Sequence, residues 1–190
     1  MCGRYYIEID DSELEEIVRE AEKRVKEYPG QITLKTAGEI FPTDTVPVLT
    51  SPGICAPMKW GFISFKGSPV INARSETALE KPMFQKAMLE RRCLIPASGY
   101  YEWRVEEGKS KKTKYRIHLP GECMYFAGCF RQEKGSALPH FVILTKQASE
   151  SISVIHDRMP LILPTANAES WFSGNPDMSS YISDLEFSVV

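Results

Sequence analysis

The sequence lacks any C-x-x-C pair, and its five cysteines are an odd number for 190 residues. Four of the five stand within apolar runs. An odd count without paired spacing argues against the disulfide framework of a small secreted protein and against a zinc site. We therefore expect reduced, mostly buried thiols, no metal and no cofactor.

Long apolar runs are also missing. No segment approaches the roughly 20 apolar residues that span a bilayer, and no basic leader precedes an apolar run. We expect no membrane insertion and a cytoplasmic location, with nucleoid association in a bacterium or a nuclear location in a eukaryote. The net charge of -2 gives no global attraction to nucleic acid, so a nucleic-acid site must be a local cluster of Arg and Lys.

Length and patterning predict one domain over residues 1–190, with 43% hydrophobic residues to fill one core. Nothing requires more than a monomer. The fold class that we expect is α+β, with a mostly antiparallel, barrel-like sheet and a few peripheral helices. Helical spacing and caps predict helices near 12–25, 82–92, 149–155 and 168–172. Strands are predicted near 5–7, 46–50, 54–65, 93–95, 100–105, 115–119, 124–130, 141–145 and 161–163.

Cys2 follows Met1 and precedes Gly3. A side chain as small as that of Cys2 should permit removal of Met1, which would leave an α-amine and a thiol on one residue. Such a 1,2-aminothiol can form a Schiff base with an aldehyde and then close a thiazolidine on the same carbon. Both groups titrate near neutrality, at about 8 for the amine and about 8.5 for the thiol when unperturbed. The alternative is that the cysteine at position 2 has no functional role.

Glu102 is the candidate acid/base, because Tyr100, Tyr101 and Trp103 surround it. An apolar setting raises the pKa of a carboxyl group towards neutrality. On a strand, however, Glu102 shares its face with Tyr100 and Arg104. The alternative is therefore an exposed Glu102 that pairs with Arg104.

His156 is the histidine best placed for proton transfer, since it stands before Asp157 and Arg158 in a predicted loop. His118 and His140 lie in apolar strand patterns and are interpreted as packing or edge residues. Asn72 follows an apolar pair, where its amide could orient a sugar hydroxyl or the N-terminal amine, or simply end a strand. The Lys-rich segment 106–114 is typical of a solvated hairpin tip, although its lysines could touch phosphate.

Five motifs in order along the chain resemble the SRAP family, named for SOS response-associated peptidase. The matching segments are Met1-Cys2-Gly3-Arg4, Trp60-Gly61, Ile71 to Thr77, Gly99 to Trp103, and Ile155 to Pro160. The resemblance implies a sensor of abasic sites in single-stranded DNA that forms a covalent DNA–protein crosslink and so shields the damaged site. It implies that the amine of mature Cys2 attacks C1′ of the opened sugar and that its thiol closes the thiazolidine.

The same resemblance implies roles for further residues. Glu102 would move protons during formation and reversal of the crosslink, His156 would assist sugar opening, and Asn72 would position the reacting groups. Arg4, Arg74 and Arg158 would hold flanking phosphates, with Trp103 packing nearby.

Two segments depart from the pattern of the family. Residues 63–66 stand where relatives commonly carry a Pro and a Trp that wedge the DNA, and 39–42 stand where relatives often carry an Asn before the proline. Pro42 and Phe65 are the candidate wedge residues here. These departures leave open whether a single strand or a junction is preferred.

Three other functions compete. The first is a peptidase with Cys2 as nucleophile and His156 as base. The second is a non-covalent reader of modified or damaged DNA, for which Arg4, Arg74 and Arg158 with the aromatic residues would form the surface. The third is a lyase that uses the N-terminal amine for β-elimination at the abasic site.

Overall fold

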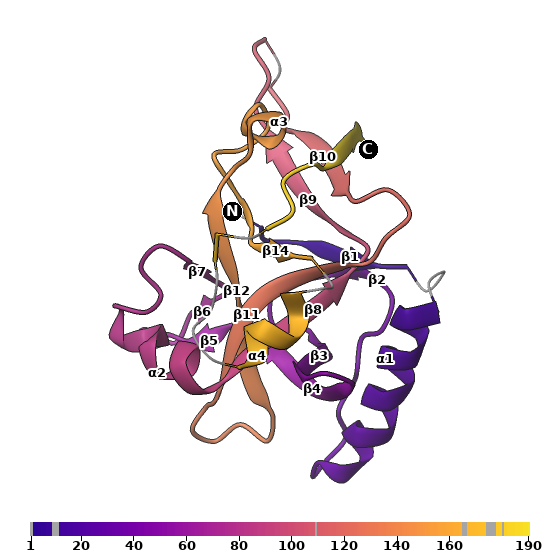
Figure 1. Cartoon of the computed structure of the whole chain (residues 1–190), viewed down its shortest axis with the longest axis vertical. Helices are drawn as coiled ribbons and strands as arrows, with labels where there is room; N and C mark the ends of the chain where they lie inside the picture. The colour runs from indigo at the N-terminus through magenta and orange to yellow at the C-terminus, as the bar shows by residue number, and fades with distance from the viewer. Residues whose placement is uncertain (1, 9–11, 109, 165–166, 174–177, 180) are drawn as a thin grey trace.

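The computed structural model describes residues 2–8, 12–108, 110–164, 167–173, 178–179 and 181–190. Two β-sheets form the body of the molecule, and the helices lie at its periphery (Figure 1). None of the helices in the described part of the chain is long and apolar enough to cross a membrane.

Five strands close into a ring, because β12 pairs with both ends of the β4-β3-β8-β11 run. The ring strands are β12 (Pro139–Gln147), β4 (Ile54–Trp60), β3 (Thr45–Ser51), β8 (Arg92–Ala97) and β11 (Met124–Gln132). Every pairing in the ring is antiparallel except that of β12 with β4. Three short strands extend this sheet: β7 (Asn72–Arg74), β13 (Arg158–Pro160) and β14 (Ile162–Leu163). The predicted mostly antiparallel, barrel-like α+β fold is confirmed.

Strand alternation separates the interior of the ring from its outer wall. On β12, Phe141 and Ile143 belong to the core cluster inside the ring, whereas Val142 and Leu144 belong to the cluster outside it. This follows from the two-residue period of a strand. Gly128 lies on the interior face, where a Cβ would come within 2.6 Å of the Cδ1 of Ile95, so only glycine fits there.

A second sheet of five strands packs on the ring through the same core cluster. Its order is β15 (Glu186–Val189), β10 (Thr113–His118), β9 (Gly99–Arg104), β1 (Tyr5–Ile7) and β2 (Gly38–Ile40). Tyr5 and Tyr100 face each other in register between β1 and β9. Both rings pack edge-on against Phe126 of the barrel. This seam between the two sheets is where Cys2 lies.

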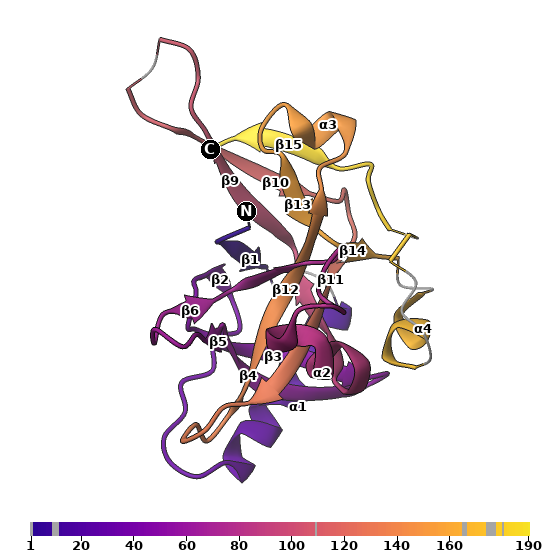
Figure 2. The same ribbon diagram turned by 90° about the vertical axis from the view of Figure 1, so that its left-hand side faces the viewer.

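Helices α1 (Ser12–Arg24), α2 (Pro82–Glu90) and α4 (Ala168–Phe172) pack on strands of the ring from outside, and the 3₁₀ helix η1 (Val25–Glu27) follows α1. The short helix α3 (Glu150–Ser153) instead contributes Ile152 to the core cluster that contains Cys2. In α2, Phe84, Ala87 and Met88 are the buried residues, at the helical spacing of one face. The small hairpin of β5 (Phe62–Ile63) and β6 (Pro69–Val70) lies beside β12 (Figure 2).

Several sequence predictions need correction. Residues 54–65 do not form one strand, because Gly61 adopts a φ of +115° between β4 and β5. No strand was predicted at β2, which pairs with β1, or at β15, which pairs with β10. The five cysteines are free thiols, and all but Cys123 are buried, as predicted.

Candidate active site

Cys2 is completely buried at the seam between the two sheets, with 0% of its surface exposed. Its thiol contacts the carbonyl oxygen of Arg4 at 3.8 Å. Burial, and after it the negative charge of Glu102, raises the pKa of the Cys2 thiol well above its ordinary value. The thiol is therefore protonated at neutral pH in this state, and a nearby base must take its proton before sulfur can act as a nucleophile.

Asn72 reaches Cys2 directly. Its side-chain Nδ2 donates a hydrogen bond of 2.8 Å to the carbonyl oxygen of Cys2. β7 holds Asn72 opposite Ile143 of β12. Trp60 fixes the preceding residue, because its Nε1 donates a hydrogen bond of 3.0 Å to the carbonyl oxygen of Ile71. The Trp60-Gly61 motif thus has a role that the sequence did not reveal: it anchors the segment that carries Asn72.

Glu102 is buried, with 5% of its surface exposed. The alternative of an exposed Glu102 paired with Arg104 is therefore wrong, because Glu102 faces the core while Arg104 is exposed. β9 lies between β1 and β10, and its Tyr100 and Glu102 share the face that packs on the barrel. The charge of Glu102 acts on both Cys2 and Tyr100. A buried carboxylate beside a thiol is the arrangement that proton transfer requires.

Three polar atoms around Cys2 are buried and lack a hydrogen-bond partner among the described residues. They are the hydroxyls of Tyr5 and Tyr100 and the Oδ1 of Asn72. Burial is the main cause that raises the pKa of both tyrosines, and the charge of Cys2 is the next. An unpaired buried polar group costs about 1–3 kcal/mol, so such groups are rare and call for an explanation. Hydroxyl and carbonyl groups of a polar ligand would supply the missing partners.

His156 stands in the turn before β13. Its Nδ1 lies 2.7 Å from the Oδ1 of Asp157 and 3.0 Å from the backbone nitrogen of Arg158. A protonated Nδ1 can donate to Asp157, whereas an unprotonated Nδ1 can accept from Arg158. His156 consequently has a partner in either protonation state, which suits a residue that gains and loses a proton.

Arg158 connects the His156 turn to the segment after Asn72. Its guanidinium makes two hydrogen bonds to the carboxylate of Glu76, of 2.6 and 2.9 Å, and one of 2.6 Å to the carbonyl oxygen of Thr145. The hydrogen bond from Arg158 is the main cause that lowers the pKa of Glu76 to about 2. Arg158 therefore already holds an internal anion, and a phosphate would have to compete with Glu76 for it.

Arg4 belongs to a cluster of cations and aromatic rings on the outer face of the second sheet. Its guanidinium lies 4.0 Å from the ring centre of Phe41 and 5.0 Å from that of Trp103. Glu39 accepts from Arg4 at 3.1 Å and also pairs with Lys114. Lys114 stacks on Tyr101 at 3.8 Å. Sequence reasoning missed Glu39, Phe41 and Lys114 as members of this cluster, because only strand pairing brings the three segments together.

The remaining candidates lie on separate loops and strands. Arg74 is exposed on β7, and its side chain makes no hydrogen bond or ion pair with the described residues. Pro42 is half-buried in the turn between β2 and β3, next to Thr43, whose nitrogen donates to the carbonyl oxygen of Trp60 at 2.9 Å. Phe65 is fully exposed in the β5–β6 hairpin. The two candidate wedge residues thus come from different turns.

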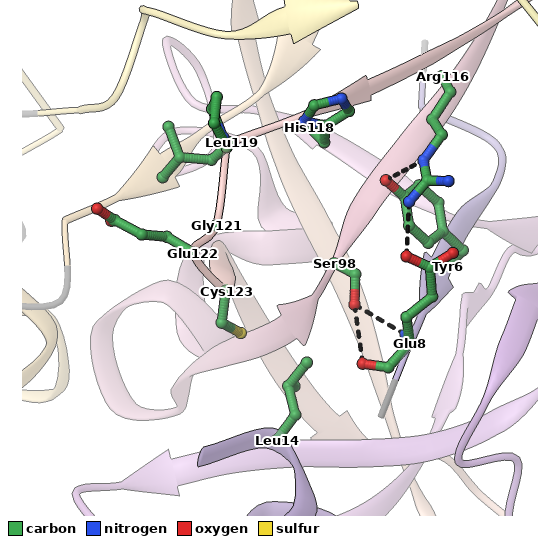
Figure 3. Close-up of a pocket in the computed structure, with 11 residues that line it drawn as sticks. Tyr6, Glu8, Leu14, Ser98, Arg116, His118, Leu119, Gly121, Glu122 and Cys123 are labelled. Carbon is green, nitrogen blue, oxygen red and sulfur yellow. Dashed lines mark hydrogen bonds and ion pairs between the residues drawn. The ribbon is translucent and has the colours of Figure 1, made fainter. Parts of the chain in front are cut away.

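A hollow of about 650 Å³ lies elsewhere in the described structure. Figure 3 shows that its wall includes Tyr6, Glu8, Arg116 and Ser98, joined by hydrogen bonds and an ion pair. None of Cys2, Asn72, Glu102 and His156 lines it. The candidate site is instead defined by the contacts of Cys2, because Asn72 donates to its carbonyl oxygen and the charge of Glu102 acts on its thiol. His156 remains a candidate from its motif and its place in the turn before β13.

Comparison with known proteins gives a consistent result. The family model described as SOS response associated peptidase (SRAP) matches residues 1–187. The chain is 29% identical to the abasic site processing protein YoqW of Bacillus subtilis, over 97% of this chain and 86% of the relative. It is 33% identical to the abasic site processing protein YedK of Escherichia coli, over 60% of this chain and 53% of the relative.

Solved structures show the same fold. A protein from Bacteroides thetaiotaomicron superposes with a TM-score of 0.74 at 21% identity, covering 98% of this chain and 91% of the other. A phage-related protein from Bordetella bronchiseptica gives a TM-score of 0.67 at 24% identity, with 100% and 94% covered. Because the family model matches nearly the whole length of this chain, the chain belongs to the SRAP family.

Proposed function

We propose that this protein processes abasic sites in single-stranded DNA by trapping them covalently on Cys2, and that it acts as a monomer. In the proposed reaction the amine of mature Cys2 adds to the C1′ aldehyde of the opened sugar, and loss of one water gives a Schiff base. The sulfur then bonds to the same carbon, and the thiol proton passes to nitrogen. The product is a thiazolidine, and the sum is aldehyde plus aminothiol giving thiazolidine plus water.

The observation that carries the proposal is the set formed by the buried residues Cys2 and Glu102 with the half-buried Asn72. Asn72 fixes the carbonyl of the reacting residue at 2.8 Å. Glu102 is buried and close enough for its charge to act on the thiol. Because burial holds the thiol protonated, Glu102 is the base that would take the thiol proton and return it to nitrogen. The unpaired atoms of Tyr5, Tyr100 and Asn72 support a polar ligand at this place.

The relatives' names support the same substrate class, since they are named abasic site processing proteins. An abasic site offers no base edge, so recognition must rest on the aldehyde and on phosphate contacts. Arg4 and Trp103, which lie together on the outer face of the second sheet, are proposed DNA contacts, and Arg74 is a further exposed cation on the Asn72 strand. His156 is proposed to assist sugar opening, because Nδ1 has a partner in both protonation states. Pro42 and Phe65 are proposed to wedge the flanking DNA.

Peptidase activity is the second candidate. It would need Cys2 as a thiolate nucleophile activated by an imidazole. Burial and the charge of Glu102 both oppose the thiolate form of Cys2. The geometry therefore favours the aldehyde reaction, in which the amine attacks first and the thiol reacts within the same residue.

The test is the intact mass of the protein before and after incubation with a single-stranded oligonucleotide that carries one abasic site. We expect the starting protein to lack Met1, a residue outside the described part of the chain, and the product to gain the oligonucleotide less one water without any reductant. Cys2→Ala should give an adduct only when borohydride traps the Schiff base. Cys123→Ala, which removes the half-buried thiol, should react like the parent protein.

Two outcomes would count against the proposal. Equal binding of the oligonucleotide by the parent protein and Cys2→Ala, with no covalent product, would favour a non-covalent reader. Full crosslinking by a protein with a bulky residue inserted before Cys2, so that Met1 is retained, would refute the aminothiol chemistry.

A further inference from the structure

The phenol hydroxyl of Tyr100 lies in the core around Cys2. The described part of the protein offers this hydroxyl no hydrogen-bond partner. The side chain is completely buried, and its hydroxyl makes no hydrogen bond with the described residues. Tyr100 and Cys2 belong to the same core cluster, and the charge of Glu102 acts on this hydroxyl. It is therefore a donor held in the core around the reacting residue and left without a partner among the residues that the structure describes.

The ring of Tyr100 is held firmly. It packs edge-on against Phe126, with 6.1 Å between the ring centres. Its backbone pairs with Tyr5 across β1 and β9. Glu102 stands two residues along the same strand, so both side chains point to the same face of the sheet. A hydroxyl fixed in this way can bind a ligand without an ordering cost, which is the condition for precise positioning.

We propose that the Tyr100 hydroxyl donates a hydrogen bond to a hydroxyl of the opened sugar, and so selects an aldehyde that belongs to a sugar over a plain aldehyde. The proposal rests on the proposed trapping of abasic sites by Cys2. Opening of the sugar ring frees a hydroxyl group, which a simple aldehyde lacks. Asn72 provides the complementary acceptor, because its Oδ1 is also buried and has no partner among the described residues. Tyr100 would touch the substrate and would be a specificity-determining residue of the site.

The test compares Tyr100→Phe with the parent protein in two reactions. With the abasic oligonucleotide, loss of one hydrogen bond of ordinary strength should slow crosslinking about five- to tenfold. With acetaldehyde, which carries no hydroxyl, the rate of thiazolidine formation should not change. The ratio of the two rates is thus the quantity that reports the proposed contact.

Tyr115→Phe is the matched control. Tyr115 lies on the neighbouring strand opposite Glu102, and its hydroxyl donates to Glu106 at 2.8 Å. Loss of the Tyr115 hydroxyl should leave the rates with the oligonucleotide and with acetaldehyde unchanged. It should lower the melting temperature of the protein. Tyr100→Phe should keep or raise the melting temperature, because it removes a buried hydroxyl that has no partner among the described residues of the free protein.

The outcomes separate this inference from the proposed function. If the parent protein crosslinks the abasic oligonucleotide and Tyr100→Phe does so at the same rate, the inference is wrong and the trapping reaction stands. Equal slowing with the oligonucleotide and with acetaldehyde would also overturn it, because Tyr100 would then act on Cys2 itself. Absence of crosslinking by the parent protein would remove the proposed function.

Discussion

The side-chain amide of Asn72 donates a hydrogen bond of 2.8 Å to the carbonyl oxygen of Cys2, across 70 residues of sequence. This bond fixes the backbone of the reacting residue to a strand of the barrel. We predict that Asn72→Asp slows crosslinking at least about tenfold, since a carboxylate oxygen would face the carbonyl oxygen and repel it. Single-turnover crosslinking measured on gels checks this. Asn167→Asp, the same chemical change before α4, should have no effect.

Glu102→Gln should slow both formation and reversal of the crosslink, by about 10²-fold if Glu102 is the base that moves the thiol proton. The amide keeps the shape of the side chain but cannot accept that proton. Glu107→Gln makes the same change at an exposed position just beyond the same strand and should react normally. The rate of formation is measured after mixing the protein with the abasic oligonucleotide, and the rate of reversal is measured on isolated complexes. An unaffected Glu102→Gln protein would remove Glu102 from the mechanism.

Glu39→Gln should strengthen non-covalent binding of single-stranded DNA. In the parent protein the Glu39 carboxylate forms ion pairs with Arg4 and Lys114, which would otherwise be available to phosphate groups. The Lys114 hydrogen bond is the main cause that lowers the pKa of Glu39, so the carboxylate is charged at neutral pH. If both cations then reach phosphates, the slope of log K against log salt should steepen by about 0.7 per contact.

Fluorescence anisotropy with an undamaged oligonucleotide at several salt concentrations measures this slope. Glu8→Gln is the matched control, because Glu8 pairs with Arg116 at 2.6 Å on the same sheet (Figure 3). It should leave the slope unchanged. A Glu39→Gln protein with the affinity of the parent would mean that the cluster only joins the strands.

The Glu76–Arg158 pair predicts a dependence of stability on pH. The folded protein lowers the pKa of Glu76 from 4.5 to about 2. A lowered pKa contributes stability that is fully present above pH 4.5 and is lost as the pH falls towards 2. We predict that the melting temperature falls less between about pH 6 and about pH 2.5 in Glu76→Gln than in the parent protein. Thermal melts by circular dichroism check this, and equal falls would contradict it.

The strands that form the barrel could be predicted, because they are apolar on both faces and bounded by turns. β8 and β12 are examples, since the residues that face the interior and the residues that face the helices are both apolar. β2 and β15 could not be predicted in the same way. Each is stabilised by its pairing with a distant strand rather than by its own composition.

The motifs nominated the residues of the candidate site, but they left open whether Glu102 is buried or exposed. Both faces of β9 carry aromatic residues, with Tyr100 on one and Tyr101 and Trp103 on the other. Alternation alone cannot tell which of two such faces packs on the core. Only the packing of β9 on the barrel, where Tyr100 contacts Phe126, decides that the face with Glu102 is inside. The anchoring role of Trp60 could not be predicted from the sequence either. Its indole donates to the backbone oxygen of Ile71, and a backbone acceptor leaves no trace in the residue type.

The dependence of the site on β12 has a consequence for protein synthesis. Asn72 is held by β7 and Arg158 by β13, and both strands pair with β12, which ends at Gln147. Translation produces Cys2 and Asn72 before β12, the strand that orders the partners of Cys2. A chain still being made therefore has the thiol of Cys2 without the ordered groups that would direct it. Directed reaction with an abasic site should appear only on completion of the barrel, and a chain that ends before β12 should react no faster than a short peptide with an N-terminal cysteine.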